Sequence, residues 1–579
     1  MKPPTGGFYL IITLFFFTLF TGCDTSNKQF IAVNVEGYEI GSPKQAFLVN
    51  TKAEFFQLVR TENSEVVLTG KIGLPAESDS ASGDRLSAID FSIFNNPGEY
   101  KIQTMGPGKV TSHPFHIGEN VYNNALLTMV KSYYYHRCGT RVDVGTEWNY
   151  ETCHLDDAPF YSESESSKKS VTGGWHDAGD YNKFSGNTAL SASLLLYAYE
   201  SKPQNFRDNQ LGIPESGNGT PDILDEVSWA LEWLLKMQRE DGAVYHKVSQ
   251  EKWIGEYLPT EDPSTRYLFD VSSAATASFV AASALGARHL AEYNPGLSFE
   301  LSLAAEKAWR YLEEHTENIP MGGFENPEGV SGGEYGDPND LDERLWAAME
   351  LYRLTNNGNY LTFFIDNYEE IITHTISPLS WRDAESLAFH AFLSAEIPDK
   401  NGKDVEVIWE KTIRHADTIL NVHRQNNYRN LNRPDQYYWG SNSVGLAYAF
   451  DLMQAYNLTN DLEFKYAALD QLHYVLGRNP FNLSQVTGVG SAAVKNPYHQ
   501  LSEIGGFSSP VPGMLVGGPN NHLLLNDKEI SSLPGKNYED TFANYLVNEP
   551  AINFTAILVY VTNFFSTAQS QSNDLTTSK

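Results

Sequence analysis

Two patterns of apolar and polar residues divide the chain. From Phe30 to about Ile117, runs such as "QAFLVN", "FFQLVR" and "LSAIDFSIF" lie between turn clusters such as "NNPGEY" and "GPGK". Short alternating runs bounded by turn residues are typical of strands with one buried face. We therefore expect residues 29–117 to form a small all-β sandwich.

A helical period replaces this alternation after about residue 122. Apolar residues recur at i, i+3, i+4 and i+7 in segments such as "DILDEVSWALEWLLKMQ", "LAAEKAWRYLEEH" and "SNSVGLAYAFDLMQAYNL". A chain of 579 residues is too long for one hydrophobic core, so residues 122–565 are expected to form a second, all-α domain. The last segment, 566–579, reads "STAQSQSNDLTTSK" and is expected to be a disordered tail.

The first 23 residues have the pattern of a targeting signal. Lys2 precedes the apolar run "FYLIITLFFFTLF", which is shorter than the roughly 20 residues of a membrane span but suits a signal peptide. The run ends in "LFTGC", which resembles a bacterial lipobox with Phe20 where Leu is usual. We expect Cys23 to be lipidated and the protein to be an exported lipoprotein, anchored to a membrane at the cell surface or in the periplasm. The alternative is a plain secretory signal or an anchor with an incidental cysteine.

The charge of the chain limits its partners. A net charge of −31 repels phosphate backbones and disfavours nucleic acid. Aromatic residues make up 13% of the chain, and rings beside polar residues suit stacking on the apolar faces of sugars, although most aromatic residues are simply core. A neutral or cationic partner is therefore favoured.

Two carboxylate motifs lie far apart in the sequence. "DAGD" contains Asp177 and Asp180, which together could hold and deprotonate a water. A metal loop or a turn with a capping aspartate are the alternatives. Glu549 lies in "LVNEPAINF", and a protonated glutamate opposite an ionised aspartate is what acid/base cleavage of an acetal needs. A lone glutamate is otherwise an ordinary surface residue.

Several longer motifs resemble glycoside hydrolase family 9, the inverting cellulase family. They include "GGWHDAGDYNKF", "LHYVLGRNPFNLSQVTGVG" and "YEDTFANYLVNEPAINF", and they follow the family's order from about residue 122 to 562. The β segment, with "VNVEGY", resembles the family's N-terminal immunoglobulin-like module. The resemblance implies an (α/α) barrel of six helix pairs with an open cleft. It also implies that Asp180 is the general base, that Asp177 helps to hold the water, and that Glu549 is the general acid.

The resemblance extends to residues that would contact the sugar chain. Loops that line the family's cleft carry the candidates Trp175, His246, Trp253, Tyr438 and Trp439. Each could instead pack beneath the cleft.

One segment departs from the family. Where the family commonly has "HHR", this chain has Tyr498, His499 and Gln500. We expect Tyr498 and His499 to contact substrate, and we expect the changes to move the preference away from plain cellulose.

The resemblance implies two metal sites, and the first is a structural zinc site. Cys138, Cys153 and His154 would supply three ligands, with His176 as the fourth and His136 as the next choice. A Cys138–Cys153 disulfide is the alternative for an exported protein.

The second metal site that the resemblance implies is a calcium site. "GGEYGDPNDLDERLW" brings several carboxylates close together in the sequence, and hard oxygen ligands suit Ca²⁺. The resemblance favours Asp342 and Glu343, with Asp383 joining them from the next loop; Asp337 and Asp340 belong to the same cluster. The alternative is that these acids only favour the start of a helix. No organic cofactor is expected.

Three functions remain open from the sequence. The first is an endo-acting hydrolase of β-1,4-glucosidic bonds in cellulose, mixed-linkage glucan or xyloglucan. The second is an exo-acting β-glucosidase or exo-β-glucosaminidase, since an acidic pocket suits a cationic amino sugar. The third is a glycan-binding lipoprotein without catalysis. We expect a monomer in each case.

Overall fold

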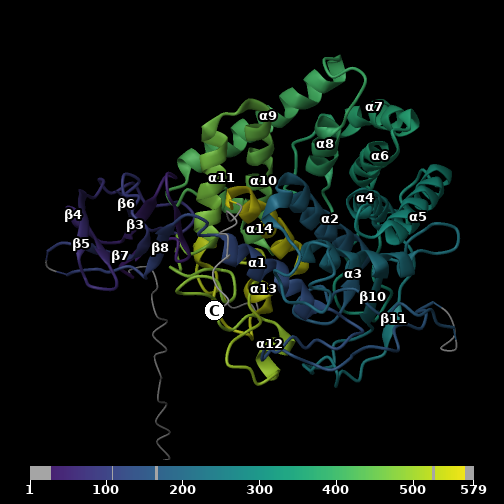
Figure 1. Cartoon of the computed structure of the whole chain (residues 1–579), viewed down its shortest axis with the longest axis horizontal. Helices are drawn as coiled ribbons and strands as arrows, with labels where there is room; N and C mark the ends of the chain where they lie inside the picture. The colour runs from purple at the N-terminus through teal and green to yellow at the C-terminus, as the bar shows by residue number, and fades with distance from the viewer. Residues whose placement is uncertain (1–27, 107, 163–166, 524–528, 568–579) are drawn as a thin grey trace, which may run out of the picture.

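The computed structural model describes residues 28–106, 108–162, 167–523 and 529–567, and it contains a β domain packed beside a larger helical domain (Figure 1). The leader with Cys23 lies outside the described residues, as does most of the expected tail. Ser566, the first residue of that segment, is fully buried, and its Oγ donates to Thr562 O at 2.9 Å. Within the described residues, no helix is both long and apolar enough to span a membrane.

The β domain is a sandwich of two sheets. One sheet has the order β1-β3-β6 and the other has the order β2-β8-β7-β4-β5. The strands are β1 (Phe30–Ala32), β2 (Gly37–Glu39), β3 (Gln45–Val49), β4 (Phe55–Arg60), β5 (Val66–Lys71), β6 (Leu86–Asp90), β7 (Gly98–Thr104) and β8 (Phe115–Gly118). Apolar side chains such as Leu48, Leu58 and Ile102 are buried between the sheets, as the alternating pattern predicts.

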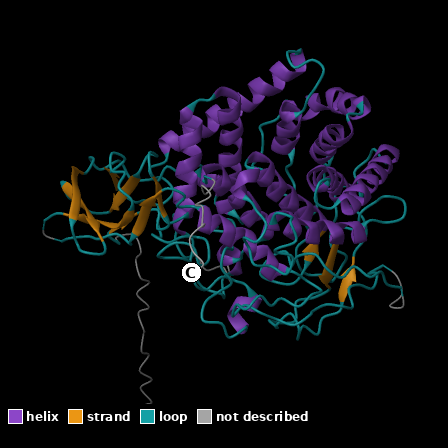
Figure 2. Ribbon diagram, viewed as in Figure 1, coloured by secondary structure: helices purple, strands orange, loops and turns teal. Residues whose placement is uncertain are grey.

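The helical domain is an (α/α) barrel, drawn in purple in Figure 2. In the described part of the chain its inner ring consists of α2 (Ser185–Ser201), α4 (Ser273–Leu290), α6 (Leu341–Thr355), α8 (Glu385–Ser394), α10 (Ser441–Thr459) and α14 (Ile552–Phe565). Helix α14 packs against α2 and closes the ring. The outer helices are α1 (Asn123–Ser132), α3 (Asp222–Met237), α5 (Pro295–Glu314), α7 (Gly358–Ile372), α9 (Lys403–Gln425) and α11 (Leu462–Val475). The expected barrel of six helix pairs is thus observed.

A small sheet and two short helices lie in the loops at one end of the barrel. The sheet has the order β11-β10-β9, with β9 (Lys183–Phe184), β10 (Lys247–Gln250) and β11 (Arg266–Leu268). The short helices are α12 (Gln500–Ile504) and α13 (Tyr545–Asn548). Strand β9 follows directly after "DAGD", so this sheet anchors the carboxylate loop to the neighbouring loops.

The two domains are joined by direct hydrogen bonds. Val35 N in the β domain donates to Leu476 O at 2.8 Å, and the hydroxyl of Tyr122, at the start of the helical domain, donates to Gly37 O at 3.2 Å. The Lys536 ammonium forms an ion pair with Asp84 of the β domain at 2.6 Å, and both side chains are buried. Because these contacts are buried, the β domain is part of the scaffold that supports the barrel loops.

Candidate active site and metal-binding groups

An open cleft of about 1110 Å³ crosses the loop end of the barrel. Asp177, Asp180 and Glu549 all line it, so residues about 370 positions apart in the sequence meet in one site. Backbone hydrogen bonds explain the meeting. Ile552 N, at the start of α14, donates to Asp177 O at 2.9 Å, and Tyr498 N donates to Asn548 O at 2.9 Å.

Gly179, inside "DAGD", allows the segments to come this close. A Cβ atom at this position would lie 2.0 Å from Tyr498 O, so only glycine fits. The Gly179 N–H donates to Glu549 Oε1 at 3.3 Å, and Gly179 O accepts from Gln500 N at 2.9 Å. The glutamate therefore faces the loop that carries the two aspartates.

Asp177 is buried, and two side chains fix its carboxyl group. Its Oδ1 accepts from Asn187 Nδ2 at 2.7 Å, and its Oδ2 accepts from the Tyr335 hydroxyl at 2.8 Å. Burial raises the pKa of Asp177 to about 7, although both hydrogen bonds oppose the rise. The sequence reasoning selected neither Tyr335 nor Asn187, because nothing in the sequence links either of them to "DAGD".

Asp180 and Glu549 differ in their surroundings. Asn182 binds both oxygens of Asp180, through its backbone N–H at 3.2 Å and its side-chain amide at 2.6 Å. Burial raises the pKa of Asp180, while Asn182 and the positive charge of Arg266 oppose the rise. Burial, followed by the negative charge of Asp180, holds the pKa of Glu549 well above its usual value. The three carboxyls therefore suit a site where one group is protonated and another ionised.

Four of the seven expected substrate residues line the cleft: Trp253, Tyr438, Trp439 and Tyr498. Trp253 and Trp439 are 42% and 37% exposed, so their rings are available to a ligand. The cleft also contains aromatic residues that the sequence reasoning did not select, among them Trp381, Phe542 and Tyr545. Trp381 stands two positions before Asp383 in the sequence, and that adjacency was its available signal.

The other three expected substrate residues do not reach the cleft. Trp175 is fully buried, and its indole N–H donates to Glu226 at 2.8 Å inside the barrel. His246 stacks on Phe324, with both ring nitrogens within hydrogen-bonding distance of other residues of the chain. His499 is buried with its Nδ1 2.8 Å from Ser502 Oγ. These three expectations are corrected: the side chains support the loops from beneath.

The segment that departs from the family pattern places its two replaced residues in different environments. Tyr498 lies in the cleft and stacks on Phe542, with ring centroids 5.0 Å apart. Gln500 is buried, and its Oε1 accepts from Tyr257 N at 3.0 Å. Of the two replaced positions, only Tyr498 is placed to contact a ligand in the cleft.

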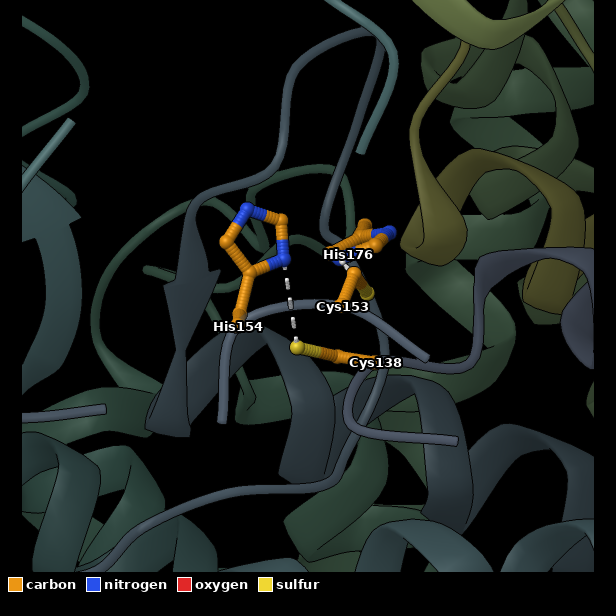
Figure 3. A group of neighbouring side chains, drawn as sticks. All are labelled: Cys138, Cys153, His154 and His176. Atoms are coloured by element: carbon orange, nitrogen blue, oxygen red, sulfur yellow. Dashed lines mark hydrogen bonds between the residues drawn. The ribbon is translucent and has the colours of Figure 1, made fainter. Parts of the chain in front are cut away.

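The sulfur and imidazole groups expected to bind zinc converge (Figure 3). Ligand atoms of Cys138, Cys153, His154 and His176 all lie within 4.8 Å of one another, and both cysteines are free thiols. Cys138 Sγ is 3.7 Å from His154 Nδ1, and Cys153 Sγ is 3.9 Å from His176 Nε2. Tetrahedral zinc with ordinary bond lengths would place sulfur and nitrogen ligands about 3.6 Å apart. The donor set and spacing therefore fit a tetrahedral metal ion, and His136 lies outside the group.

A second group consists of three buried carboxylates, Asp337, Asp342 and Glu343, whose oxygens also lie within 4.8 Å of one another. Both oxygens of Glu343 and Oδ2 of Asp337 have no hydrogen-bond partner among the described residues. Buried carboxylates without donors are costly unless a cation neutralises them, so the group fits a hard metal ion.

The other two acids of the expected calcium cluster lie apart from this group. Asp340 instead pairs with Arg344 at 2.8 Å. Asp383 lines the cleft and accepts from Ser380 Oγ at 3.0 Å. The expectation that Asp383 joins the carboxylate group is therefore corrected.

Two family models match the chain. Residues 122–562 match the model described as "Glycosyl hydrolase family 9", and residues 26–109 match "Cellulase N-terminal ig-like domain". The chain belongs to glycosyl hydrolase family 9. It is therefore a glycoside hydrolase with the family's N-terminal immunoglobulin-like domain, and the resemblance seen in its motifs is confirmed.

Several endoglucanases are similar to this chain over most of its length. "Endoglucanase D" of Acetivibrio thermocellus is 33% identical over 562 residues, which covers 95% of this chain and 86% of that protein. The "Xyloglucan-specific endo-beta-1,4-glucanase" of Bacteroides ovatus is 31% identical, covering 91% of this chain and 92% of that protein. The crystal structure of a "Zn-binding triple mutant" of a family 9 endoglucanase aligns with a TM-score of 0.84 and 33% identity, covering 92% of this chain and all of that one.

Proposed function

We propose that this family 9 enzyme cleaves internal β-1,4-glucosidic bonds of a β-glucan with inversion at the anomeric carbon. The observation that carries the proposal is the meeting of Asp177, Asp180 and Glu549 in one open cleft lined by exposed aromatic rings. An open cleft admits the middle of a long chain, and aromatic rings suit the apolar faces of glucosyl units. The endoglucanase relatives support the same activity.

The chemistry divides between the two ends of the site. Protonated Glu549 donates its proton to the glycosidic oxygen, while Asp180 removes a proton from a water that attacks the anomeric carbon from the opposite face. Asp177, held by Asn187 and Tyr335, accepts a hydrogen bond from that water and orients it. The glycosidic C–O bond breaks as the new C–O bond forms. Asp180 ends protonated and Glu549 ionised, and both return to their starting states through solvent.

A decorated β-glucan such as xyloglucan is the favoured substrate. Tyr498 stands in the cleft where the family commonly has a histidine, and the family's arginine is replaced by Gln500, which is buried. The cleft thus loses one charge-assisted contact to sugar hydroxyls and gains a stacking surface made by Tyr498 and Phe542. The similarity to a xyloglucan-specific endoglucanase agrees with this choice.

Zinc and calcium are the metals that we propose for the two groups. Cys138, Cys153, His154 and His176 would hold zinc as a structural ion, which fixes the segment immediately before Asp177. Asp337, Asp342 and Glu343 would hold calcium, which neutralises their charges at the start of α6. Neither ion takes part in the proton transfers.

The leader suggests where the enzyme works. We propose that cleavage before Cys23 and lipidation of its thiol anchor the exported enzyme to a membrane, as the sequence "LFTGC" favours. Retention of the native protein in a detergent phase, with loss of retention for Cys23→Ser, would support the anchor.

The catalytic assignment is tested with Asp180→Asn and Glu549→Gln. Each should lower kcat about 10²- to 10⁴-fold with oligosaccharide binding retained, because each removes one proton-transfer group. Glu256→Gln, which changes an exposed carboxyl in the same cleft, is the matched control and should keep nearly native kcat.

Product analysis completes the test. The substrates are cello-oligosaccharides, mixed-linkage glucan, xyloglucan and chitosan oligomers. Proton NMR during hydrolysis should show the α-anomer first and products of several lengths. A β-anomer, or release of a single monosaccharide only, would contradict inversion or endo action respectively. If cellotetraose is the best substrate, the choice of a decorated glucan is wrong.

A further inference from the structure

A small polar cavity borders Asp180 separately from the cleft. Its volume is about 10 Å³, and its walls include Asp180, Gln250, Asp262, Arg266 and Gln500. A polar cavity of this size holds about one water molecule, provided that two to four groups bind it.

Arg266 supplies the unpaired donors of this cavity. It lies on β11, is only 4% exposed, and donates from Nη2 to Asp157 Oδ2 at 2.8 Å. Its Nε and Nη1 atoms have no hydrogen-bond partner among the described residues. Leaving buried N–H groups of a cation unpaired is costly, so a partner is required.

Asp157 holds the Arg266 guanidinium through its Nη2 atom. Asp157 also binds the Lys183 ammonium at 2.8 Å, and Lys183 is fully buried with further hydrogen bonds to Val171 O and Gly173 O. Asp157 therefore has a second cation and does not need Arg266 for its own neutralisation. The Nε and Nη1 atoms of Arg266 remain without a partner among the described residues, and Arg266 forms part of the cavity wall.

The acceptors of the cavity complement these donors. Asp180 and Asp262 are carboxylates in the same wall, whereas Gln250 and Gln500 already use their side-chain oxygens, binding Ser264 Oγ and Tyr257 N respectively. One water could accept two hydrogen bonds from Arg266 and donate one to each carboxylate, which fills its four positions. An anion is disfavoured because two of the walls are carboxylates.

We propose that Arg266 is a positioning residue for the catalytic base, acting on Asp180 through a water molecule held in this cavity. The proposal rests on the proposed role of Asp180. A cation bridged to the base by water favours the ionised carboxylate that must receive a proton from the attacking water. The same bridge adds a hydrogen bond to Asp180 beside the two from Asn182.

The charges around Asp180 determine how far this effect reaches. The acidic groups are Asp177, Asp262 and Glu549, of which Glu549 is protonated in the proposed mechanism, and the positive groups are Lys247 and Arg266. The neighbouring phenols are Tyr181, Tyr335 and Tyr498. Removal of Arg266 therefore leaves Lys247 as the one cation of this set beside the carboxyls of Asp177, Asp180 and Asp262.

The first experiment is a crystal structure of the native enzyme at a resolution that shows ordered water. We expect one water within hydrogen-bonding distance of Arg266 Nε or Nη1 and of an oxygen of Asp180. A collapsed cavity, with both nitrogens bonded to protein atoms, would overturn the proposal whatever the activity of the enzyme.

The second experiment compares Arg266→Gln and Arg266→Lys. Loss of the charge in Arg266→Gln should move the acidic limb of the kcat/KM profile up by about one pH unit and lower kcat, with KM nearly unchanged. Arg266→Lys keeps the charge, so its acidic limb should stay near that of the native enzyme. Metal content and circular dichroism are measured on every variant. These measurements reveal any damage to the fold or to the thiol and imidazole group of Cys138, Cys153, His154 and His176.

Arg288→Gln is the matched control, since Arg288 pairs with Glu200 and Glu350 on barrel helices and does not border the cavity. It should lower stability without moving the acidic limb. An unmoved acidic limb in a folded, metal-loaded Arg266→Gln would overturn the proposal. Native-like activity of Asp180→Asn would instead overturn the proposed function, so the two failures are distinguishable. If Arg266→Gln does not fold, the crystal structure alone decides.

Discussion

At the scale of single residues, hydrogen bonds decide which carboxyl in the cleft holds a proton. Burial raises the pKa of Asp177, Asp180 and Glu549 alike. Hydrogen-bond donors then separate them. Asp180 accepts from Asn182 at both oxygens, whereas the one donor to the Glu549 carboxyl within the described part of the chain is the Gly179 N–H at 3.3 Å. The residue with fewer donors and more negative neighbours keeps its proton, which is the property that a general acid needs.

The pH dependence of activity follows from these shifts. Because the pKa of Asp180 is raised, kcat/KM should rise with pH above the usual range of an aspartate, as the base ionises. Because the pKa of Glu549 is raised well above its usual value, activity should persist at mildly acidic to neutral pH and fall as Glu549 loses its proton. The measurement is kcat/KM against pH on a soluble β-glucan. An optimum below about pH 4 would contradict a protonated Glu549 at working pH.

Tyr335→Phe tests the support of Asp177. The change removes the hydrogen bond at 2.8 Å to Asp177 Oδ2, and a hydrogen bond to a charged group contributes about 1.5–3 kcal/mol. We expect kcat to fall about tenfold or more with little change in KM, since the water is oriented less well.

The matched control for this test is Tyr197→Phe. It removes a buried tyrosine hydroxyl that donates to Glu350 at 2.7 Å, between barrel helices. The control should lower the melting temperature and leave kcat near native. Equal losses of kcat in the two variants would mean that Tyr335 acts only on stability.

At the scale of elements, short anchored loops bring the site together. "DAGD" is fixed on one side by β9, which pairs with β10, and on the other by the segment before α12 through the close approach at Gly179. The thiol and imidazole group ties the chain at Cys138, Cys153 and His154 to His176, the residue before Asp177. A metal ion there would limit the motion of the whole loop.

Removal of the metal should therefore weaken both stability and activity. Cys138→Ser is expected to abolish stoichiometric zinc, to lower the melting temperature by several degrees, and to reduce kcat, because a structural zinc site stabilises the folded loop. Elemental analysis of the purified protein and thermal melts with and without a chelator are the measurements. Glu343→Gln is the control: it should change calcium binding and leave the zinc content unchanged. A Cys138–Cys153 disulfide in protein without zinc would end this prediction.

At the scale of the whole molecule, the β domain and the barrel form a continuous folded unit. Asp84 of the β domain is fully buried, and it accepts from Lys536, Asn50 and the Tyr428 hydroxyl. Two of these donors, Lys536 and Tyr428, come from the helical domain. Separating the domains would therefore expose the Asp84 carboxylate or leave it with fewer hydrogen-bond donors. The β domain therefore contributes to stability without lining the cleft.

Lys536→Met tests this interface. Removal of one partner from a buried ion pair costs about 3–5 kcal/mol, and we expect the lower end because Asp84 keeps two other donors. The midpoint of the first denaturant transition should fall, while kcat of the folded enzyme stays near native. The double variant Lys536→Met with Asp84→Asn should recover part of the loss. Arg414→Met, which breaks an exposed pair with Glu410, is the control and should cost less than about 1 kcal/mol. A cost no greater than that of the control would show that the interface is weak.

The sequence by itself determined the two domains, the helical barrel and the three carboxyls, since these depend on local periods and on long motifs. The β pattern before Ile117 and the outer helices α3 and α5 were readable because each has one more buried and one more exposed face. Helix α14 gave a weaker signal. As an inner helix it is buried nearly all round, so its apolar residues have no helical period to detect.

Only the tertiary structure decided which side chains face the cleft. Trp175 and Trp253 both lie in loops with the right motifs, yet Trp175 is fully buried against Glu226 and Trp253 is 42% exposed. Tyr335 and Arg266 reach the "DAGD" loop from distant segments, and Asp383 lines the cleft and lies outside the carboxylate group that it was expected to join. The direction of a loop side chain depends on packing between residues far apart in the chain, and no local pattern in the sequence records it.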